Sequence, residues 1–196
     1  MREALQERVG KPHLSYSSLK YALGDMKLWE MYMKGQLKKK SEALYFGSLY
    51  DLLLFEPEKF NDVYYTLDDS DIVDAIGGKS PRSTKKYREW KAEAGQMTEN
   101  ANKRLKDSGL YDKRFAGGKF QVEFNVDLDG IPLKGFLDCL REGEFIVDSK
   151  SSRSIDKFRY DVNSWSYDIQ AYIYTKVFGI KDYYWVVQEK AYPFYP

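Results

Sequence analysis

The middle of the sequence reads as three consecutive β-strands, and this segment constrains the fold more than any other. Phe120 to Leu128 alternates apolar and polar residues, which is the period of a half-buried strand. Asp129-Gly130 follows as a strong hairpin signal, and Ile131 to Leu140 reads as the returning strand. A turn then leads to a third, largely apolar strand, Phe145 to Lys150. An antiparallel meander is therefore expected here.

Helical patterns surround this meander. Ser15 is a candidate N-cap for a helix that reaches about Met33, and Pro57 ends a second apolar helix. That second helix covers 42–55. The other expected elements are a strand at 62–67, an acidic loop at 68–81, helices at 82–93, 98–108, 154–161 and 164–178, and a last strand at 183–190. This order predicts one α/β or α+β domain with a mixed central sheet flanked by helices. Its N-terminal helical part covers about 1–110 and its sheet core about 119–196.

Composition excludes several classes of protein. Hydrophobic residues make up 43% and charged residues 31%, which fits neither a disordered chain nor a membrane protein. No apolar run approaches the ~20 residues that span a bilayer, and the first residues do not open a signal peptide, so a cytoplasmic location is expected. Cys139 is the single cysteine and His13 the single histidine, which excludes an internal disulfide, an iron–sulfur cluster and a His-rich zinc site. Cys139 is expected to be a buried thiol.

Charge is distributed unevenly although the net charge is only +1. Lys38-Lys39-Lys40 and the stretch from Lys79 to Lys91, which contains Arg82, Lys85, Lys86 and Arg88, are basic. Such local patches can contact phosphates. Solvated helix faces are the alternative interpretation of the same runs.

Register determines whether three polar side chains of the meander meet. If Glu142 to Glu144 forms a three-residue loop, with Gly143 available for positive φ, Asp138 pairs directly with Asp148. A two-residue loop would place the two aspartates on opposite faces. Lys150 lies two residues beyond Asp148 and shares its face, and counting back from Asp129-Gly130 puts Glu123 opposite Phe136, on the face of Asp138.

Two carboxylates and one amine at a single point suit phosphodiester hydrolysis. Carboxylates can bind Mg²⁺ or Mn²⁺, which prefer oxygen ligands and keep open positions for water and phosphate. A lysine can then orient the attacking water. Alternating charges on a surface strand are the alternative for Asp148 and Lys150 taken alone, but Asp138 at a workable spacing favours the metal site.

These residues match a known family. Asp138 followed by Asp148-Ser149-Lys150 resembles the PD-(D/E)XK nuclease superfamily, in particular its RecB-like branch and the phage-type and RecE-like exonucleases. Three further segments of the sequence, in the order of the family, support the resemblance: the SxSxL-like start at 14–19, the G-[ST]-x-x-H-like segment at 46–60, and the Q-x-x-x-Y motif at 170–174. The resemblance covers most of the chain.

The resemblance implies roles for individual residues. Asp138 and Asp148 would bind the metal, with the backbone carbonyl of Ser149 as a further ligand, and Lys150 would position the water. Gln170 would hold the active-site strand or the DNA backbone. Tyr174 would assist it, although helix-to-sheet packing is an alternative for both. Two more carboxylates enter the predicted metal set: Asp51, which stands where the family has a histidine, and Glu123 as an outer or second-metal ligand.

The resemblance also implies a function. We expect a Mg²⁺- or Mn²⁺-dependent deoxyribonuclease, an exonuclease acting on duplex ends in phage or plasmid recombination or replication, in a bacterial or phage-infected cell. DNA would be held mainly by its backbone, through Lys85, Lys86, Arg88, Lys38 and Lys39. A recombination or replication protein could be a partner, and the chain could form an oligomer. Two alternatives remain open: a catalytically degenerate DNA-binding or protein-interaction module, which Asp51 favours, and an RNA-directed nuclease.

Overall fold

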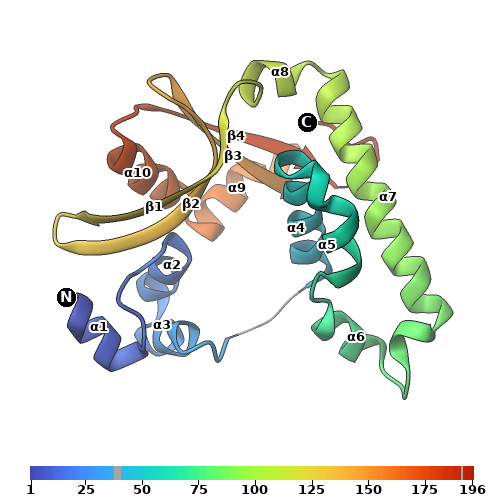
Figure 1. Ribbon diagram of the computed structural model, residues 1–196, viewed down its shortest axis with the longest axis horizontal. Helices are drawn as coiled ribbons and strands as arrows, with labels where there is room; N and C mark the ends of the chain where they lie inside the picture. The colour runs from blue at the N-terminus through green and yellow to red at the C-terminus, as the bar shows by residue number, and fades with distance from the viewer. Residues whose placement is uncertain (38–40, 191) are drawn as a thin grey trace. The chain divides into compact units, whose positions relative to one another are not determined.

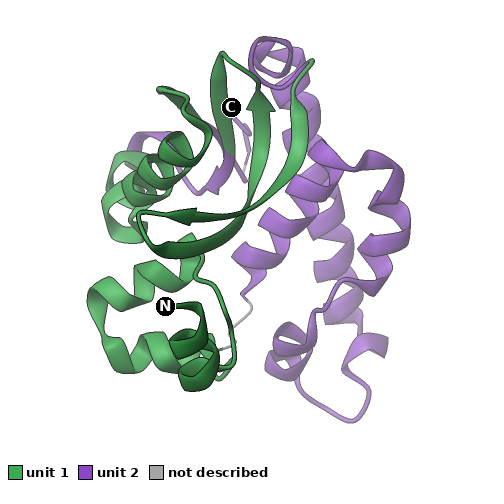
Figure 2. Cartoon of the chain, turned by 60° about the vertical axis from the view of Figure 1, so that its left-hand side comes forward, with its two compact units in different colours: residues 1–38, 117–148, 157–185 green, residues 39–116, 149–156, 186–196 purple. Residues whose placement is uncertain are grey.

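The computed structural model describes residues 1–37, 41–190 and 192–196. The chain forms two compact units, shown in green and purple in Figure 2. The first unit contains residues 1–38, 117–148 and 157–185, and the second contains 39–116, 149–156 and 186–196. Lys38 and Lys39, two of the expected DNA-binding residues, lie outside the described residues.

A four-stranded sheet in the order β1-β2-β3-β4 provides the framework (Figure 1). Its strands are β1 (Lys119–Leu128), β2 (Ile131–Arg141), β3 (Phe145–Ser152) and β4 (Asp182–Glu189). The first three strands pair antiparallel. Phe145 packs edge-on against Tyr184 near the start of both β3 and β4, and the Ser152 carbonyl accepts the N–H of Lys190 near their ends, so these two strands run parallel. The mixed sheet expected from the sequence is confirmed.

The register of the meander is the expected one. Leu128 pairs with Ile131 and Glu123 with Phe136 across the first hairpin. Across the second, Arg141 pairs with Phe145 and Cys139 with Val147, which leaves a three-residue loop whose central Gly143 has φ 73°. Continuing this ladder by one residue places Asp138 directly opposite Asp148.

The first unit packs helices against β1 and β2. Its helices are α1 (Arg2–Val9), α2 (Tyr16–Gly24), α3 (Met26–Met33), most of α9 (Ile155–Trp165) and α10 (Tyr167–Phe178). Trp29 and Met33 from α3, Phe124 and Leu137 from the strands and Ile173 from α10 belong to one buried cluster. This core fixes α10 against the strands that carry Asp138 and Asp148.

The second unit is mainly helical. It contains α4 (Glu42–Phe55), α5 (Phe60–Thr66), α6 (Ser70–Ile76), α7 (Lys85–Asp107), α8 (Leu110–Arg114) and two short 3₁₀ turns, Pro57–Lys59 and Pro81–Ser83. Its core contains Tyr45, Leu49, Phe60, Ile72 and Ala94. The ends of β3 and β4 also belong to this unit. None of the helices among the described residues has the length and apolar character required to cross a membrane.

Two expectations for the extent of the helices are wrong. The helix predicted from Ser15 to Met33 is divided into α2 and α3, because Asp25 is extended and its carboxylate accepts the N–H groups of Lys27 and Leu28 as the cap of α3. The expected Ser15 cap of α2 is present. The helices predicted at 82–93 and 98–108 are one helix, α7, and a Cβ on its Gly95 would lie 2.9 Å from the Tyr64 hydroxyl oxygen, so this glycine permits close packing.

The predicted strand 62–67 is the helix α5, and the predicted loop 68–81 contains α6. Tyr and Val favour strands by propensity, but tertiary packing overrides that preference here. Phe60 and Tyr64 stack at helical i,i+4 spacing with ring centroids 5.7 Å apart, and Phe60 is buried in the core of the second unit. Ile72 and Val73 bury the apolar side of α6 in the same way.

Candidate active site

Two facing carboxylates form the centre of the site, within the first unit. The register of β2 and β3, continued by one residue beyond Cys139 and Val147, places Asp138 opposite Asp148, and directly opposed residues have Cβ atoms roughly 4.5–5.5 Å apart. Ile146 and Val147, which precede Asp148, are fully buried, so the strand carries the carboxylate inward. Only 2% of Asp148 is exposed. Burial of a carboxylate is costly and requires polar or charged partners.

Gln170 from α10 is one of those partners. Its side-chain amide donates a hydrogen bond of 2.8 Å to Oδ1 of Asp148, and only 6% of Gln170 is exposed. The sequence left two roles open for Gln170, a contact with the strand or with the DNA backbone. The observed hydrogen bond is to the strand, and it fixes the orientation of the carboxylate from the helix side.

Tyr183 on β4 is a member of the site that the sequence analysis missed. Burial, followed by the negative charges of Asp148 and Asp138, raises the pKa of the Tyr183 hydroxyl above its ordinary value. The fields of both carboxylates therefore act on one buried hydroxyl, which stays protonated. The prediction of a last strand at 183–190 could have identified this residue had the pairing of that strand with β3 been considered.

Tyr174 lies one turn after Gln170 on α10 and packs against the sheet. Its ring meets Phe124 edge-on with centroids 5.4 Å apart and lies 6.5 Å from the ring of Tyr183. Tyr174 is 6% exposed. These contacts fit the packing alternative, and a catalytic part for Tyr174 stays a prediction.

Lys150 and Ser149 follow Asp148 on β3. Strand alternation directs Lys150 to the face of Asp148 and Ser149 to the opposite one. The Lys150 ammonium lies 3.5 Å from the carbonyl oxygen of Ser149, and Ser149 is buried. The roles of the ammonium in catalysis and of the carbonyl as a metal ligand stay predictions.

The two additional carboxylates have other surroundings. Glu123 is half exposed and forms an ion pair of 2.6 Å with Lys134. Asp51 lies on α4 in the second unit, where its negative charge, after burial, contributes to raising the pKa of Tyr50. No group of three or more His, Cys, Asp or Glu residues that could hold a metal ion is found within residues 1–37, 41–190 and 192–196. The predictions of Asp51 and Glu123 as metal ligands remain predictions.

The Asp138–Asp148 pair nevertheless fits a divalent cation. Mg²⁺ is commonly bound through one or two carboxylates and completes its coordination with water and substrate phosphate oxygens. The pair supplies two such carboxylates, and the Gln170 amide orients one of them. The sulfur of Cys139 is no competing ligand, because burial raises the pKa of this thiol to about 12. The expectation that Cys139 is buried is confirmed.

The basic stretch from Lys79 to Lys91 divides into two groups. Lys85, Lys86 and Arg88 are exposed in the first turn of α7, and Lys85 forms an i,i+4 ion pair of 3.5 Å with Glu89. Arg82 and Lys91 instead form ion pairs with the buried carboxylate of Asp69, at 2.6 and 3.8 Å. These two charges compensate Asp69, and a contact of Arg82 or Lys91 with a phosphate backbone stays a prediction.

Comparisons with known proteins agree with this architecture. The chain is similar to a solved structure from Eubacterium rectale described as a "Putative exonuclease", with 20% identity, a TM-score of 0.65, and coverage of 99% of this chain and 72% of that chain. At this identity the likeness shows the fold. No curated protein matches the chain. The model of a family described as a PDDEXK-like domain of unknown function, DUF3799, matches residues 15–189 and so nearly the whole chain. The resemblance to the PD-(D/E)XK superfamily is confirmed, and the chain belongs to this family of PDDEXK-like domains.

Proposed function

We propose that the chain is a divalent-metal-dependent nuclease with its active centre at Asp138 and Asp148. The proposal rests on the register of β2 and β3, which directs both residues to one face, and on the hydrogen bond from the Gln170 amide to the buried Asp148 carboxylate. Membership in a PDDEXK-like family supports it. A buried carboxylate needs polar or charged partners, and a divalent cation would be a suitable one for Asp148.

Each residue has a distinct task in this proposal. Asp138 and Asp148 would hold the cation, and Gln170 keeps the Asp148 carboxylate in one orientation. When bound, the cation would polarise the scissile phosphate and lower the pKa of a water molecule. Lys150, on the same strand face as Asp148, would position the attacking water and offset negative charge as the phosphodiester is cleaved.

We further propose DNA ends as the substrate. This finer proposal is supported by the resemblance to phage-type exonucleases and by the description of the structural neighbour as an exonuclease. The exposed Lys85, Lys86 and Arg88 would contact the phosphate backbone, which gives salt-dependent binding with little sequence readout. A role in phage or plasmid recombination, with a partner protein and an oligomeric assembly, belongs to the same proposal.

Two incubations test the proposal. Purified protein is incubated with end-labelled linear duplex DNA and with closed circular DNA, in Mg²⁺ or in Mn²⁺. Digestion of the linear form alone is expected for an exonuclease, whereas digestion of both forms would indicate an endonuclease. Intact DNA in both metals would contradict nuclease activity on DNA, and an RNA substrate of the same length then tests the ribonuclease alternative.

Lys150→Ala tests the assignment of the ammonium. We expect cleavage to be lost while DNA binding is retained, because the residue would act on the water rather than hold the backbone. Lys113→Ala is the matched control, since Lys113 is an exposed lysine on α8 outside the proposed site. Equal turnover in wild type and Lys150→Ala would remove the lysine from the mechanism.

The second candidate function is a non-catalytic DNA-binding or protein-interaction module. Two observations favour it: Asp51 stands where the family pattern has a histidine, and the described residues contain no cluster of three metal-binding side chains. Calorimetry with Mn²⁺ separates the candidates. A nuclease should bind Mn²⁺ and lose that binding in Asp148→Ala, whereas a module without a metal centre should give no binding heat in either protein.

A further inference from the structure

A pocket of about 460 Å³ lies entirely within the second unit. Its apolar lining comes from Phe46 on α4 and from Trp90, Ala94 and Met97 on α7. Phe46 and Ala94 are buried, while Trp90 is half-buried and presents part of its indole to the pocket. Pockets of this size hold small ligands. An aromatic wall of this kind suits a flat, unsaturated ring.

Charged side chains also line this pocket. Arg153 directly follows β3 and Lys190 directly follows β4, and the two strand ends are joined by the hydrogen bond from the Lys190 N–H to the Ser152 carbonyl. Because the two strands are parallel, both cationic residues follow the carboxyl ends of strands on the same side of the sheet. Glu42 and Glu93 add two hydrogen-bond acceptors. A ligand with a phosphate and a ring carrying amino groups matches both sets of charges.

The indole of Trp90 is held in place by two tyrosines. Its ring lies 4.9 Å from that of Tyr45 and 5.7 Å from that of Tyr87, between centroids. Tyr45 and Tyr87 are themselves buried, at 4% and 9% exposure. The aromatic wall is therefore preorganised, which reduces the entropy lost when a ligand stacks on it.

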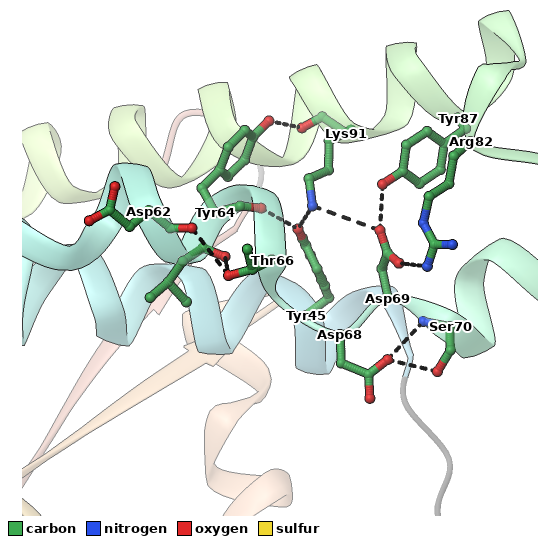
Figure 3. A network of polar contacts seen from close by, with 11 residues as sticks. Tyr45, Asp62, Tyr64, Thr66, Asp68, Asp69, Ser70, Arg82, Tyr87 and Lys91 are labelled. Atoms are coloured by element: carbon green, nitrogen blue, oxygen red, sulfur yellow. Dashed lines mark hydrogen bonds and ion pairs between the residues drawn. The ribbon is translucent and has the colours of Figure 1, made fainter.

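A buried polar network fixes those tyrosines (Figure 3). The Lys91 ammonium donates to the Tyr45 hydroxyl, and the Tyr87 hydroxyl donates to the Asp69 carboxylate. Burial would raise the pKa of Asp69, but hydrogen bonds from Tyr87 and Arg82 lower it, so the carboxylate stays ionised. Burial and the adjacent Asp69 carboxylate raise the pKa of Tyr87 to about 12. The network thus keeps both rings that pack on Trp90 in one position.

We propose that this pocket binds one unpaired nucleotide, with its base against Trp90 and its phosphate at Arg153 and Lys190. Glu42 and Glu93 accept hydrogen bonds from amino groups of the base and repel the phosphate toward the two cations. Assigning the nucleotide to a nucleic-acid strand rests on the proposed nuclease function. Arg153 is five residues beyond Asp148 in the sequence and directly follows β3, the strand that carries Asp148.

Calorimetry with single-stranded tetranucleotides tests the proposal on the full chain. The probes are four-residue deoxyadenylate and an abasic tetramer of equal length, both titrated in EDTA so that no cleavage occurs. Wild type should bind the deoxyadenylate more tightly than the abasic probe. Trp90→Leu should weaken deoxyadenylate binding by about tenfold or more and remove the difference between the probes, because stacking is lost. Trp90→Phe should restore most of the affinity.

Arg153→Gln should weaken binding of both probes and reduce the slope of log affinity against log salt by about 1. Lys113→Gln removes an equal charge from exposed α8 and should change neither quantity. Arg153 is exposed, so its variant remains informative if Trp90→Leu unfolds. Equal affinity for the two probes in wild type, or wild-type binding in folded Arg153→Gln, would overturn the proposal.

A cleavage assay tests the proposed nuclease function independently of the pocket. Asp148→Ala should abolish cleavage of linear DNA in Mg²⁺ but keep the tetranucleotide affinity, since Asp148 is no part of the pocket. Trp90- and Arg153-dependent binding by a wild-type protein that cleaves nothing would uphold the pocket and refute the nuclease. Cleavage by a protein whose tetranucleotide binding is unchanged in the Trp90 and Arg153 variants would uphold the nuclease and refute the pocket.

Discussion

Replacing Gln170 by methionine tests how far the proposed active centre depends on one hydrogen bond. Methionine is unbranched and of similar length, so it fills the same space on α10 without the amide. The amide donates to a carboxylate at 2.8 Å, and both side chains are almost fully buried. The substitution therefore removes one charge-assisted hydrogen bond in a place where water cannot easily replace it.

The magnitude follows from the charge and burial of the pair. Loss of a hydrogen bond to a charged group costs about 1.5–3 kcal/mol. At about 2–4 °C per kcal/mol for a chain of this length, the unfolding midpoint should fall by about 3–12 °C. Loss of an outer partner that orients a metal-binding carboxylate should also weaken Mn²⁺ binding by about 10–100-fold. Stability and metal affinity should therefore fall together.

Calorimetric scanning without metal and Mn²⁺ titration of the folded protein measure the two effects. Tyr172→Phe is the matched control, because Tyr172 lies on the same helix but is 61% exposed. It should leave both quantities unchanged. A Gln170→Met protein with wild-type midpoint and wild-type Mn²⁺ affinity would show that the hydrogen bond neither stabilises the fold nor prepares a metal site. A lower midpoint with unchanged Mn²⁺ affinity would restrict Gln170 to a structural role.

Three other perturbations separate charge from shape. Asp148→Asn removes a buried charge while keeping its outline, so scanning calorimetry should show equal or greater stability without metal and no rise of the midpoint with Mn²⁺. The pKa of Asp69 is lowered in the folded protein, so its stabilising effect is complete above about pH 4 and lost as the pH falls through the folded value. The free energy of unfolding of Asp69→Asn, measured with denaturant, should therefore depend less on pH between about 5 and 2 than that of wild type. An equal pH dependence in the two proteins would contradict the role of Asp69 in the network. The combined variant Lys85→Gln, Lys86→Gln and Arg88→Gln should reduce the salt slope of DNA affinity by about 3 in filter-binding assays, and an unchanged slope would place the phosphate contacts elsewhere.

The meander and its register could be predicted because short-range rules determine them. Asp129-Gly130 accepts the positive φ values of a two-residue hairpin loop, 52° and 82° in the structure. Gly143 does the same for the second loop, and side-chain alternation then assigns Asp138 and Asp148 to one face without reference to the rest of the chain. Local geometry therefore sufficed for the centre of the proposed site.

The helical segments could not be predicted with the same accuracy because long-range packing determines them. The strand-favouring residues of α5 form a helix since Phe60 and Tyr64 must reach the core of the second unit together. Gly95 reads as a helix breaker until the ring of Tyr64 is known to lie against it. Tyr183 was missed for a related reason, because only the pairing of β4 with β3 brings its hydroxyl under the influence of both aspartates.

The two buried aspartates, Asp69 and Asp148, have different surroundings. Asp69 is also buried, but Arg82 and Lys91 supply compensating positive charge. Its partners Tyr87 and Lys91 lie on α7, and Arg82 lies in the 3₁₀ turn before that helix. Asp148 has other surroundings: the neutral Gln170 amide donates a hydrogen bond to it, and the strand register directs Asp138, which carries the same sign of charge, to the same face. A strand end selected only for stability would carry apolar residues there, as Ile146 and Val147 do on the same strand. Two carboxylates that the strand register directs to one face therefore support the proposal of a cation site at this place in the sheet.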